Sequence, residues 1–252
     1  MQLQGKSALV TGGAHRVGKA ISLWLGRAGA NVAVNYNQSA EAAQDTVAEI
    51  RRLGGRALAV HADIADPSRV AAMFEAITDE FGGLDVLVNS ASGFRKTPIP
   101  MDDFTDWHYM IDVQINGSFY TSNAAAKVML AQGAGVIVNI LDLAIWQPWH
   151  GFTAHSVGKA GLLAMTRQLA LELAPNIRVN AVAPGYVLPP DYLSEERIAQ
   201  MASGTLLNRW GTPEDVAQAV QFLVEADYIT GEVIRVDGGE SIAKAKRDES
   251  DD

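Results

Sequence analysis

The stretch "LVTGGAHRVGKAISLWL", residues 9–25, decides the fold. A short apolar segment leads into a glycine-rich turn, and a helical pattern follows directly. Backbone N–H groups at Gly12, Gly13 and Gly18 can approach a pyrophosphate there, and a helix start favours its negative charge. The spacing is not G-x-G-x-x-G, and a plain strand-to-helix turn is the alternative. Its place after the first strand of an alternating pattern predicts nucleotide binding.

Seven short apolar segments alternate with longer helical patterns along the chain. These segments lie at 7–10, 31–36, 56–63, 84–91, 135–141, 177–184 and 232–239. Most are continuously apolar, which is typical of strands that are covered on both faces. The order predicts a single Rossmann-type α/β domain over residues 1–240, with a doubly wound, parallel, seven-stranded sheet and helices on both faces.

Two segments stand outside the regular pattern. Residues 184–216 form the longest irregular stretch, and because it follows a strand end we expect it to shape the ligand site. Residues 241–252 are strongly charged and are predicted to form a mobile tail.

Composition excludes several classes of function. The chain has 252 residues, of which 20 are Lys or Arg and 29 are Asp or Glu, so its net charge is -9. This charge argues against general affinity for nucleic acid or anionic membranes. No segment reaches the roughly 18 uninterrupted apolar residues that a membrane span needs. The absence of cysteine excludes disulfides and thiolate metal sites, and it fits a cytoplasmic protein.

The cofactor type can be predicted from the end of the second strand. NAD-binding sheets usually carry a carboxylate there, whereas this chain has Asn35, Tyr36 and Asn37. His15 and Arg16 lie in the glycine-rich turn, where a guanidinium can pair with a 2′-phosphate. A solvated Arg16 is the alternative, although a helix start is unfavourable for an unpaired cation. The sequence therefore favours NADP(H) over NAD(H).

A second stretch, "DLAIWQPWHGFTAHSVGK" at 142–159, resembles a proton-delivery site. His155 and Lys159 are four residues apart on a predicted helix and so share one face. Asp142 precedes them. A metal bound by Asp142, His150 and His155 is an alternative, but nothing else in the chain has metal-ligand spacing. Trp146 and Trp149 lie between, where they could hold a flat substrate or anchor a subunit contact.

The order of motifs resembles the short-chain dehydrogenase/reductase family over about residues 5–240. The matching pieces are "TGGAHRVG" (11–18), "HAD" (61–63), "NSAS" (89–92), "VQING" with Asn116, "KAG" from Lys159, "IRVNAVAPG" (177–185) and "ITGEVIRVDGG" (229–239). The resemblance implies that the adenine lies against Asp63 and Ile64, the ribose near Asn89, and the nicotinamide along Pro184 and Gly185. The predicted cofactor positions are Gly12, His15, Arg16, Val17, Gly18, Tyr36, Asn37, Asp63, Ile64, Asn89, Ala91, Lys159, Pro184 and Gly185.

Within the family, three features are most similar to the pteridine reductases. Arg16 stands where most members have the middle glycine of the turn, and Asp142 stands where most have the catalytic serine. Phe94 stands where those enzymes stack an aromatic ring on a pterin, which would contribute about 1 kcal/mol beyond burial. Phe94 packed on the core is the alternative. The predicted substrate contacts are Arg16, Ser92, Phe94, Asp142, His155 and Tyr186.

Position 155 departs from the family. The Tyr-x-x-x-Lys motif reads His155-Ser-Val-Gly-Lys159 here. If Asp142 lies beside His155, its carboxylate favours the imidazolium, which could donate a proton to a C=O or C=N group. A neutral imidazole could only donate a hydrogen bond and keep its proton. Asn116 is placed in the family's proton-relay position, with a helix–helix hydrogen bond as its alternative role.

The leading hypothesis is an NADPH-dependent reductase that passes hydride to a C=N or C=O group of a small planar substrate such as a pterin. Its predicted catalytic residues are Asp142, His155, Lys159 and Asn116. The alternatives are a carbonyl reductase resembling the 3-oxoacyl-carrier-protein reductases, and an NADP(H)-binding regulatory or scaffold protein that has lost catalysis. Family members usually form tetramers through helices that correspond to 113–132 and 155–174. The second helix is apolar nearly all round, so a homotetramer is predicted.

Overall fold

One seven-stranded sheet forms the centre of the computed structural model, which describes residues 1–190 and 193–247. The strand order is β3-β2-β1-β4-β5-β6-β7, and every neighbouring pair is parallel. The strands are β1 (Ser7–Val10), β2 (Asn31–Tyr36), β3 (Ala57–His61), β4 (Val86–Asn89), β5 (Gly135–Ile140), β6 (Ile177–Pro184) and β7 (Val233–Val236). The predicted doubly wound α/β fold is confirmed.

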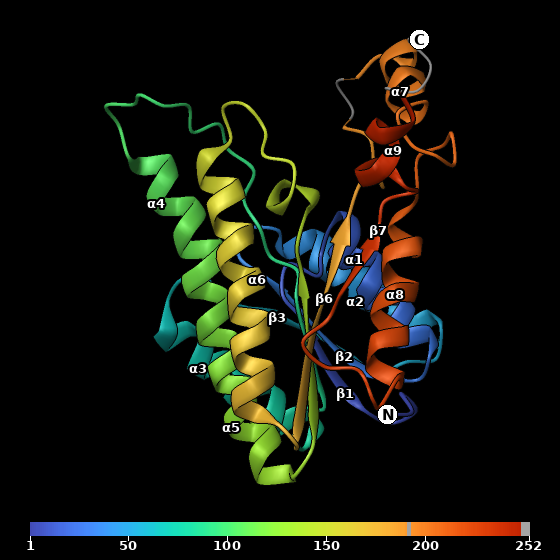
Figure 1. Cartoon of the computed structure of the whole chain (residues 1–252). Coiled ribbons are helices and arrows are strands. Elements are labelled where there is room, and N and C mark those ends of the chain that lie inside the picture. The colour runs from blue at the N-terminus through green and yellow to red at the C-terminus, as the bar shows by residue number, and fades with distance from the viewer. Residues whose placement is uncertain (191–192, 248–252) are drawn as a thin grey trace.

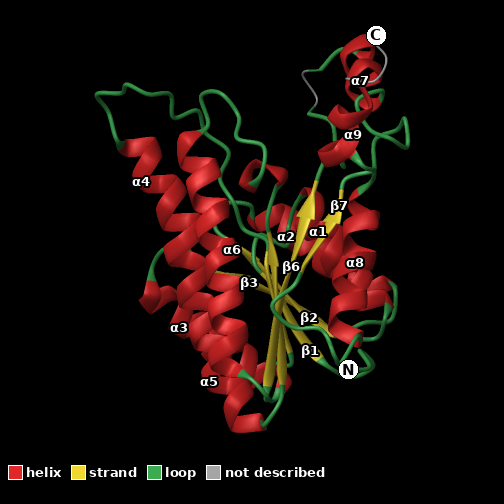
Figure 2. Cartoon of the chain, in the orientation of Figure 1, coloured by secondary structure: helices red, strands yellow, loops and turns green. Residues whose placement is uncertain are grey.

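Helices cover both faces of the sheet (Figures 1 and 2). One layer is α1 (Arg16–Arg27), α2 (Ala40–Arg52) and α8 (Pro213–Glu225). The other is α3 (Pro67–Phe81), α4 (Thr105–Ile111), α5 (Ser118–Gln132) and α6 (Thr153–Leu173). Because successive strand residues face opposite sides, Val10 packs in the first core and Leu9 in the second. The continuous apolar runs of the strands thus fill two cores.

Several predicted boundaries differ from the structure. The strand predicted over 232–239 ends at Val236, because Gly238 and Gly239 turn the chain with φ of 57° and 81°. The irregular stretch 184–216 contains a helix, α7 (Glu195–Ala202), and its residues 191 and 192 lie outside the described part. The predicted mobile tail begins as helix α9 (Glu240–Arg247), while residues 248–252 are not described.

The helix predicted over 113–132 is part of a longer run. Helix α4 continues into a π-helical segment, Asp112–Gly117, and then into α5. Such wide turns are rare and change which side chains face a neighbouring element.

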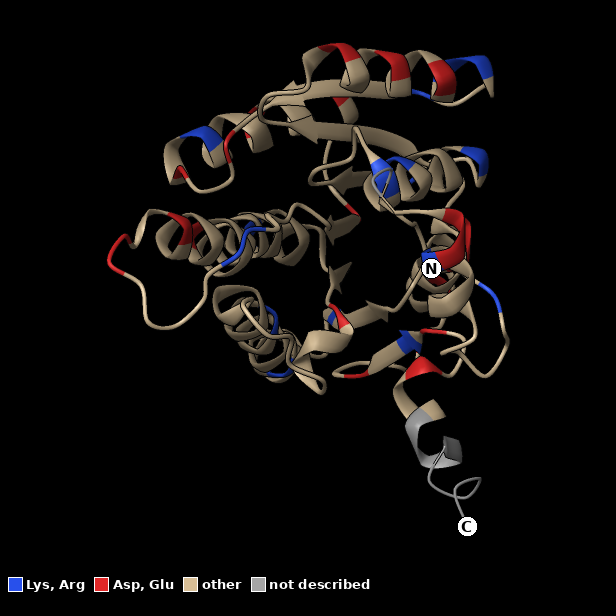
Figure 3. Cartoon of the chain, turned by 90° about the horizontal axis from the view of Figure 1, so that it is seen from above, with Lys and Arg blue, Asp and Glu red and all other residues tan. Residues whose placement is uncertain are grey.

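Charged residues lie mostly on the outer helices and loops, as the view from above in Figure 3 shows. Among the described residues, no helix is long and apolar enough to cross a membrane.

Candidate active site

The predicted site residues gather where parallel strands end. The glycine-rich turn follows β1, Ala91 and Phe94 follow β4, Asp142 follows β5, and Tyr186 follows β6. Since the carboxyl ends of parallel strands meet at one edge of a sheet, these segments, far apart in sequence, lie at the same edge.

The glycine-rich turn is tightly closed against its neighbours. The N–H of Gly12 donates to Asn35 Oδ1 at 3.3 Å, and the N–H of Gly13 donates to the Asn35 carbonyl at 3.0 Å. A Cβ atom on Gly18 would lie 2.2 Å from the Gly12 carbonyl oxygen, and one on Gly12 would lie 2.9 Å from Ala91 Cα. Only glycine fits at these two positions. Because the N–H groups of Gly12 and Gly13 already donate to Asn35, a pyrophosphate would bind the N–H groups at the start of α1, where Gly18 lies.

Arg16 begins α1 in an unusual backbone conformation. Its φ is 49°, in the left-handed region that favours glycine. This agrees with its placement at a position where relatives have glycine. The exposed guanidinium donates from Nη2 to the Leu188 carbonyl at 3.3 Å and so connects the turn to the loop after β6. His15 beside it is also exposed.

At the end of β2, only part of the predicted cofactor set is open to a ligand. Asn35 is buried, and its Nδ2 donates to the Ala62 carbonyl at 3.1 Å. Tyr36 is half-buried and packs against the ring of His61, while Asn37 is exposed. The exposed Asn37 is an amide, so the edge of the sheet carries no negative charge at this residue. Further along, Ile64 is buried after β3 and Asp63 Oδ1 accepts from the Ala65 N–H at 2.9 Å.

The side chain of Asn89, predicted to lie near the ribose, turns into the core. Its side chain is buried and accepts from Thr121 Oγ1 at 2.7 Å. It also donates to Ser122 Oγ at 3.0 Å and to Asn139 Oδ1 at 2.9 Å. All its polar atoms are used inside the core. Only the backbone of Asn89 is left for a ribose, because the interior hydroxyls capture the side chain.

The structure brings Asp142 and His155 together. Asp142 Oδ2 lies 3.5 Å from His155 Nε2, and Asp142 Oδ1 accepts from the Ala144 N–H at 2.8 Å. The second bond fixes the carboxylate at the start of a short 3₁₀ turn, Leu143–Ile145. The side chain of Asp142 is 24% exposed, but that of His155 is only 4% exposed. The carboxylate is thus the more open member of the pair.

Aromatic rings enclose the imidazole of His155. The Trp149 ring is stacked on it, with centroids 5.6 Å apart and an interplanar angle of 11°. Phe94 approaches edge-on at 5.2 Å, and Phe152 stacks on Phe94 at 4.6 Å. The two tryptophans, Trp146 and Trp149, therefore have different surroundings. Trp149 covers His155, whereas Trp146 is exposed and lies beside the guanidinium of Arg235.

Lys159 lies one helical turn beyond His155 on α6 and is buried. Its Nζ donates to the Ile140 carbonyl, at the end of β5, over 2.8 Å. Burial lowers the pKa of Lys159 to about 8, and the negative charge of Asp142 opposes part of this shift. The ammonium is consequently a better acid than an ordinary lysine.

This pKa predicts a pH-dependent stability. The unfolded lysine keeps its proton to about pH 10.5 and the folded one only to about pH 8. Between these values the unfolded state binds more protons, so wild-type stability rises with pH. Lys159→Met should therefore have a larger free energy of unfolding than wild type below pH 8. Removing the buried charge contributes on the order of 3 kcal/mol to this difference, and losing the hydrogen bond of Lys159 takes back about 1 kcal/mol. The advantage should vanish towards pH 10.5.

Urea unfolding at several pH values measures this difference in the free energy of unfolding. If the difference in the free energy of unfolding between Lys159→Met and wild type does not change with pH, the lowered pKa of Lys159 is contradicted.

Asn116 makes a hydrogen bond within its own helix. Its Nδ2 donates to Asp112 Oδ1 at 2.8 Å, within the π-helical segment, and no hydrogen bond joins its side chain to His155 or Lys159 in the described structure, so its relay role stays a prediction. Gln114 contacts His155, with Nε2 3.1 Å from His155 Nδ1. Residues two positions apart on a helix do not face the same side, so the offset puts Asn116 elsewhere. No sequence signal marked Gln114 beyond its place in "VQING".

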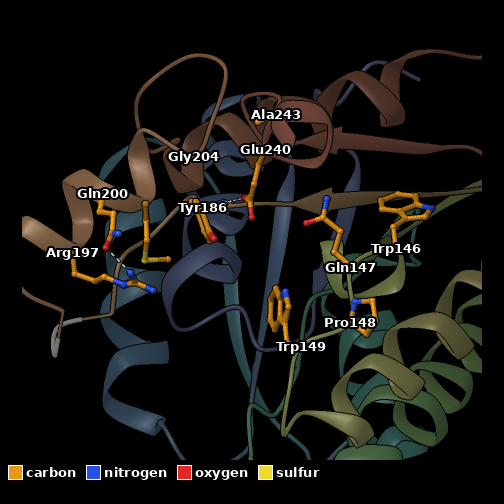
Figure 4. A pocket seen from close by; sticks show the side chains of 11 residues that line it. Trp146, Gln147, Pro148, Trp149, Tyr186, Arg197, Gln200, Gly204, Glu240 and Ala243 are labelled. Atoms are coloured by element: carbon orange, nitrogen blue, oxygen red, sulfur yellow. Dashed lines mark hydrogen bonds between the residues drawn. The ribbon is translucent and has the colours of Figure 1, made fainter. Parts of the chain in front are cut away.

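A cavity of about 580 Å³ lies next to this cluster. It is lined by Trp146, Gln147, Pro148, Trp149, Tyr186, Arg197, Gln200, Met201, Gly204, Glu240 and Ala243. Figure 4 shows Tyr186 and Glu240 on one side and Trp149 on the other. Glu240 Oε2 accepts from the Tyr186 N–H at 3.2 Å. Burial raises the pKa of Glu240 to about 7, and the charges of Asp237 and Asp142 add to the effect.

The sequence predicted Tyr186 in the site but not Glu240, Arg197 or Gln147. Glu240 is the last residue of the predicted domain, Arg197 lies in the irregular stretch 184–216, and Gln147 lies between the two tryptophans. Among the described residues, no group of three or more His, Cys, Asp or Glu side chains is placed to hold a metal ion.

The fold is a parallel seven-stranded sheet with a glycine-rich turn after β1 and a buried Lys159 near the charge of Asp142. A family model described as enoyl-(acyl carrier protein) reductase matches residues 12–241. The chain belongs to the short-chain dehydrogenase/reductase family. Members of this family use NAD(P)H.

Named relatives agree with this placement. The chain is 40% identical to a 3-oxoacyl-[acyl-carrier-protein] reductase of Synechocystis sp., covering 94% of this chain and 97% of the relative. It is 36% identical to 3beta-hydroxysteroid dehydrogenase 1 of Eggerthella lenta, over 94% of each. A crystal structure described as a short-chain alcohol dehydrogenase from Sinorhizobium meliloti superposes with a TM-score of 0.88 at 35% identity, covering 94% of this chain and 96% of that one.

Proposed function

We propose that the protein is an NADP(H)-dependent reductase that converts a carbonyl group on a planar, ring-bearing substrate into an alcohol. The observation that carries this proposal is the Asp142–His155–Lys159 cluster, which lies at the sheet edge beside an aromatic-lined cavity. The named relatives support the carbonyl group, since one acts on a 3-oxoacyl chain and another on a hydroxysteroid. The carbonyl reductase, one of the alternatives from the sequence, is therefore the function that we propose.

Residues of this chain would hold the cofactor along the strand ends. The N–H groups at the start of α1, where Gly18 lies, would take the pyrophosphate, while Ile64 would lie under the adenine. The neutral Asn37 and the cationic Arg16 favour a 2′-phosphate, which is the reason for preferring NADP(H). When bound, the reduced nicotinamide would supply the hydride.

The cavity sets the substrate class. Trp149 and Tyr186 offer flat apolar surfaces, and planar rings gain from stacking as well as from burial. Its wall includes the carboxyl group of Glu240 and the guanidinium of Arg197, so groups of both signs face the cavity. A neutral ring ketone fits such a wall, because it brings no charge of its own that would need a partner.

A pterin is the second candidate, favoured by Arg16, Asp142 and Phe94. The ring of Phe94 stacks on Phe152 and is still 59% exposed, so part of it is open to a heterocycle. The third candidate is a cofactor-binding protein without turnover. It is favoured by the 3% exposure of His155, which sits beneath Trp149.

One assay separates these three candidates. NADPH and NADH oxidation would be followed with cyclic ketones, 3-oxoacyl thioesters and oxidised pterins between pH 5 and pH 8. We expect turnover of cyclic ketones with NADPH. Turnover of pterins alone would favour the second candidate. NADPH binding without oxidation against any of these acceptors would overturn the proposal and favour the third.

We propose further that the chain forms a homotetramer through α5 and α6. These helices lie side by side (Figure 1) and expose Phe119, Leu130, Val157 and Leu171. Exposed apolar side chains grouped on neighbouring helices mark an association surface. Sedimentation velocity should give the mass of a tetramer, and Leu171→Glu should lower it. A monomeric wild type would contradict the proposal. Cytoplasmic location stays a prediction from composition.

A further inference from the structure

We infer that Gln114 is a positioning residue that holds His155 as the tautomer protonated on Nε2, so that Asp142, not His155, exchanges the proton with the substrate. The two side chains are buried, and Gln114 Nε2 lies 3.1 Å from His155 Nδ1. The catalytic part of this inference rests on the proposed function. The assignment of the proton does not.

The surroundings of Gln114 fix the orientation of its amide. Its Nε2 lies 3.2 Å from the Gly93 carbonyl oxygen and 3.1 Å from Ser92 Oγ. A carbonyl oxygen only accepts, so the amide nitrogen and not its oxygen must face Gly93. The same amide nitrogen, a donor without acceptor capacity, is the atom that lies 3.1 Å from His155 Nδ1. A proton on Nδ1 would point at a donor, whereas an unprotonated Nδ1 can accept.

The proton of the neutral ring is then on Nε2 and faces Asp142. At 3.5 Å from Oδ2, Nε2 has no well-formed hydrogen bond to any described residue, so a small shift of the carboxylate would complete one. Both ring nitrogens thus face protein groups. Trp149 covers the plane of the ring and Phe94 its edge, and His155 is 3% exposed. No nitrogen of the imidazole is left to touch a substrate.

Asp142 is open to one, with a side chain 24% exposed. Solvent first delivers a proton to the Asp142 carboxylate, which carries a negative charge in the resting site. In the reduction, the bound reduced nicotinamide would supply hydride to the carbonyl carbon, and the carbonyl oxygen would take the proton from the Asp142 carboxyl group. The C=O π bond is replaced by C–H and O–H bonds, and the O–H electron pair of Asp142 remains on the carboxylate. The Nε2–H of His155 stabilises that carboxylate by a charge-assisted hydrogen bond. Water then returns the proton to Asp142.

Nitrogen NMR of the full-length protein with ¹⁵N-labelled histidine tests the assignment without substrate or cofactor. The His155 signals are identified by their loss in His155→Phe. At pH 8 we expect Nε2 to be protonated and Nδ1 to be an unprotonated acceptor. Gln114→Glu should move the proton to Nδ1, because a carboxylate accepts where the amide donates. Gln114→Met should give a mixture of both tautomers, because it cannot donate.

Gln44→Glu is the matched control, since it adds the same charge at an exposed position of α2. It should leave the spectrum of His155 unchanged. A wild-type His155 protonated on Nδ1 would overturn the inference, as would an unchanged tautomer in a folded Gln114→Glu variant. Circular dichroism establishes folding, and the wild-type spectrum decides the matter if neither variant folds.

The kinetic consequence is a loss of kcat with little change in KM. We expect Gln114→Glu to lower kcat for a reduced ketone by about 10- to 100-fold, because an imidazole in the wrong tautomer cannot support its partner. The control should keep wild-type kcat. If no acceptor is reduced but the NMR result is as expected, the proposed function fails and the tautomer assignment stands.

Discussion

Replacing Gly18 with alanine should weaken NADPH binding by about 100-fold, which corresponds to nearly 3 kcal/mol. The added Cβ would lie 2.2 Å from the carbonyl oxygen of Gly12 and 3.2 Å from Gly13 Cα. These are backbone atoms, so the turn itself must open. Its N–H groups then no longer converge on the pyrophosphate. Fluorescence or calorimetric titration with NADPH measures the dissociation constant.

Gly26→Ala in the same helix is the control. Its Cβ would lie 2.8 Å from Cγ2 of the buried Ile50, a side-chain atom outside the turn, and Gly26 is at the far end of α1 from the turn. NADPH affinity should stay within about threefold of wild type, since the cost of such a side-chain adjustment falls on stability. Equal affinity of Gly18→Ala and wild type would show that the turn does not hold the cofactor.

Asp142→Asn should lower kcat by about 1,000-fold, within the range for loss of a general acid. The amide cannot release a proton, but its oxygen can still accept the Ala144 N–H that Asp142 Oδ1 accepts at 2.8 Å. The local turn should therefore persist. Initial rates of NADPH oxidation at saturating substrate measure kcat, and thermal unfolding should show a Tm close to wild type.

Comparing Asp142→Asn with His155→Gln shows which of the two side chains donates the proton. His155→Gln removes the imidazole but leaves Asp142, so its kcat should fall less than that of Asp142→Asn. If His155→Gln lowers kcat more and Asp142→Asn retains most of the wild-type kcat, the imidazole is the proton donor. The assignment of proton transfer to Asp142 is then wrong.

The fold could be predicted because its signals are local. Apolar runs of strand length, separated by helical patterns, gave a seven-stranded sheet, and the ends of β2 and β6 were placed at the observed residues. His155 and Lys159 share a face of α6 because helical spacing alone requires it. Likewise the restriction to glycine at Gly18 is visible in sequence, although the 2.2 Å clash behind it is not.

The sequence pointed to only part of the site. Gln114 contacts His155 because the π-helical segment and the packing of α6 decide which side chain points towards the imidazole. The side chain of Asn89 turns into the core because Thr121 and Ser122 of α5 bind it there. Glu240 is the last residue of the predicted domain and carries no signal in the sequence, and helix α9 brings it into the cavity wall.

The sequence by itself determined the sheet, the phosphate turn and the positions of Asp142, His155 and Lys159 along the chain. Each depends on the period or steric limits of one element. Only the tertiary structure decided that Gln114 contacts His155, that Trp149 covers the imidazole, and that Asp142 is the more exposed acid. Such contacts join residues from different elements, and their geometry depends on how those elements pack. The spacing of residues within one element does not predict that packing.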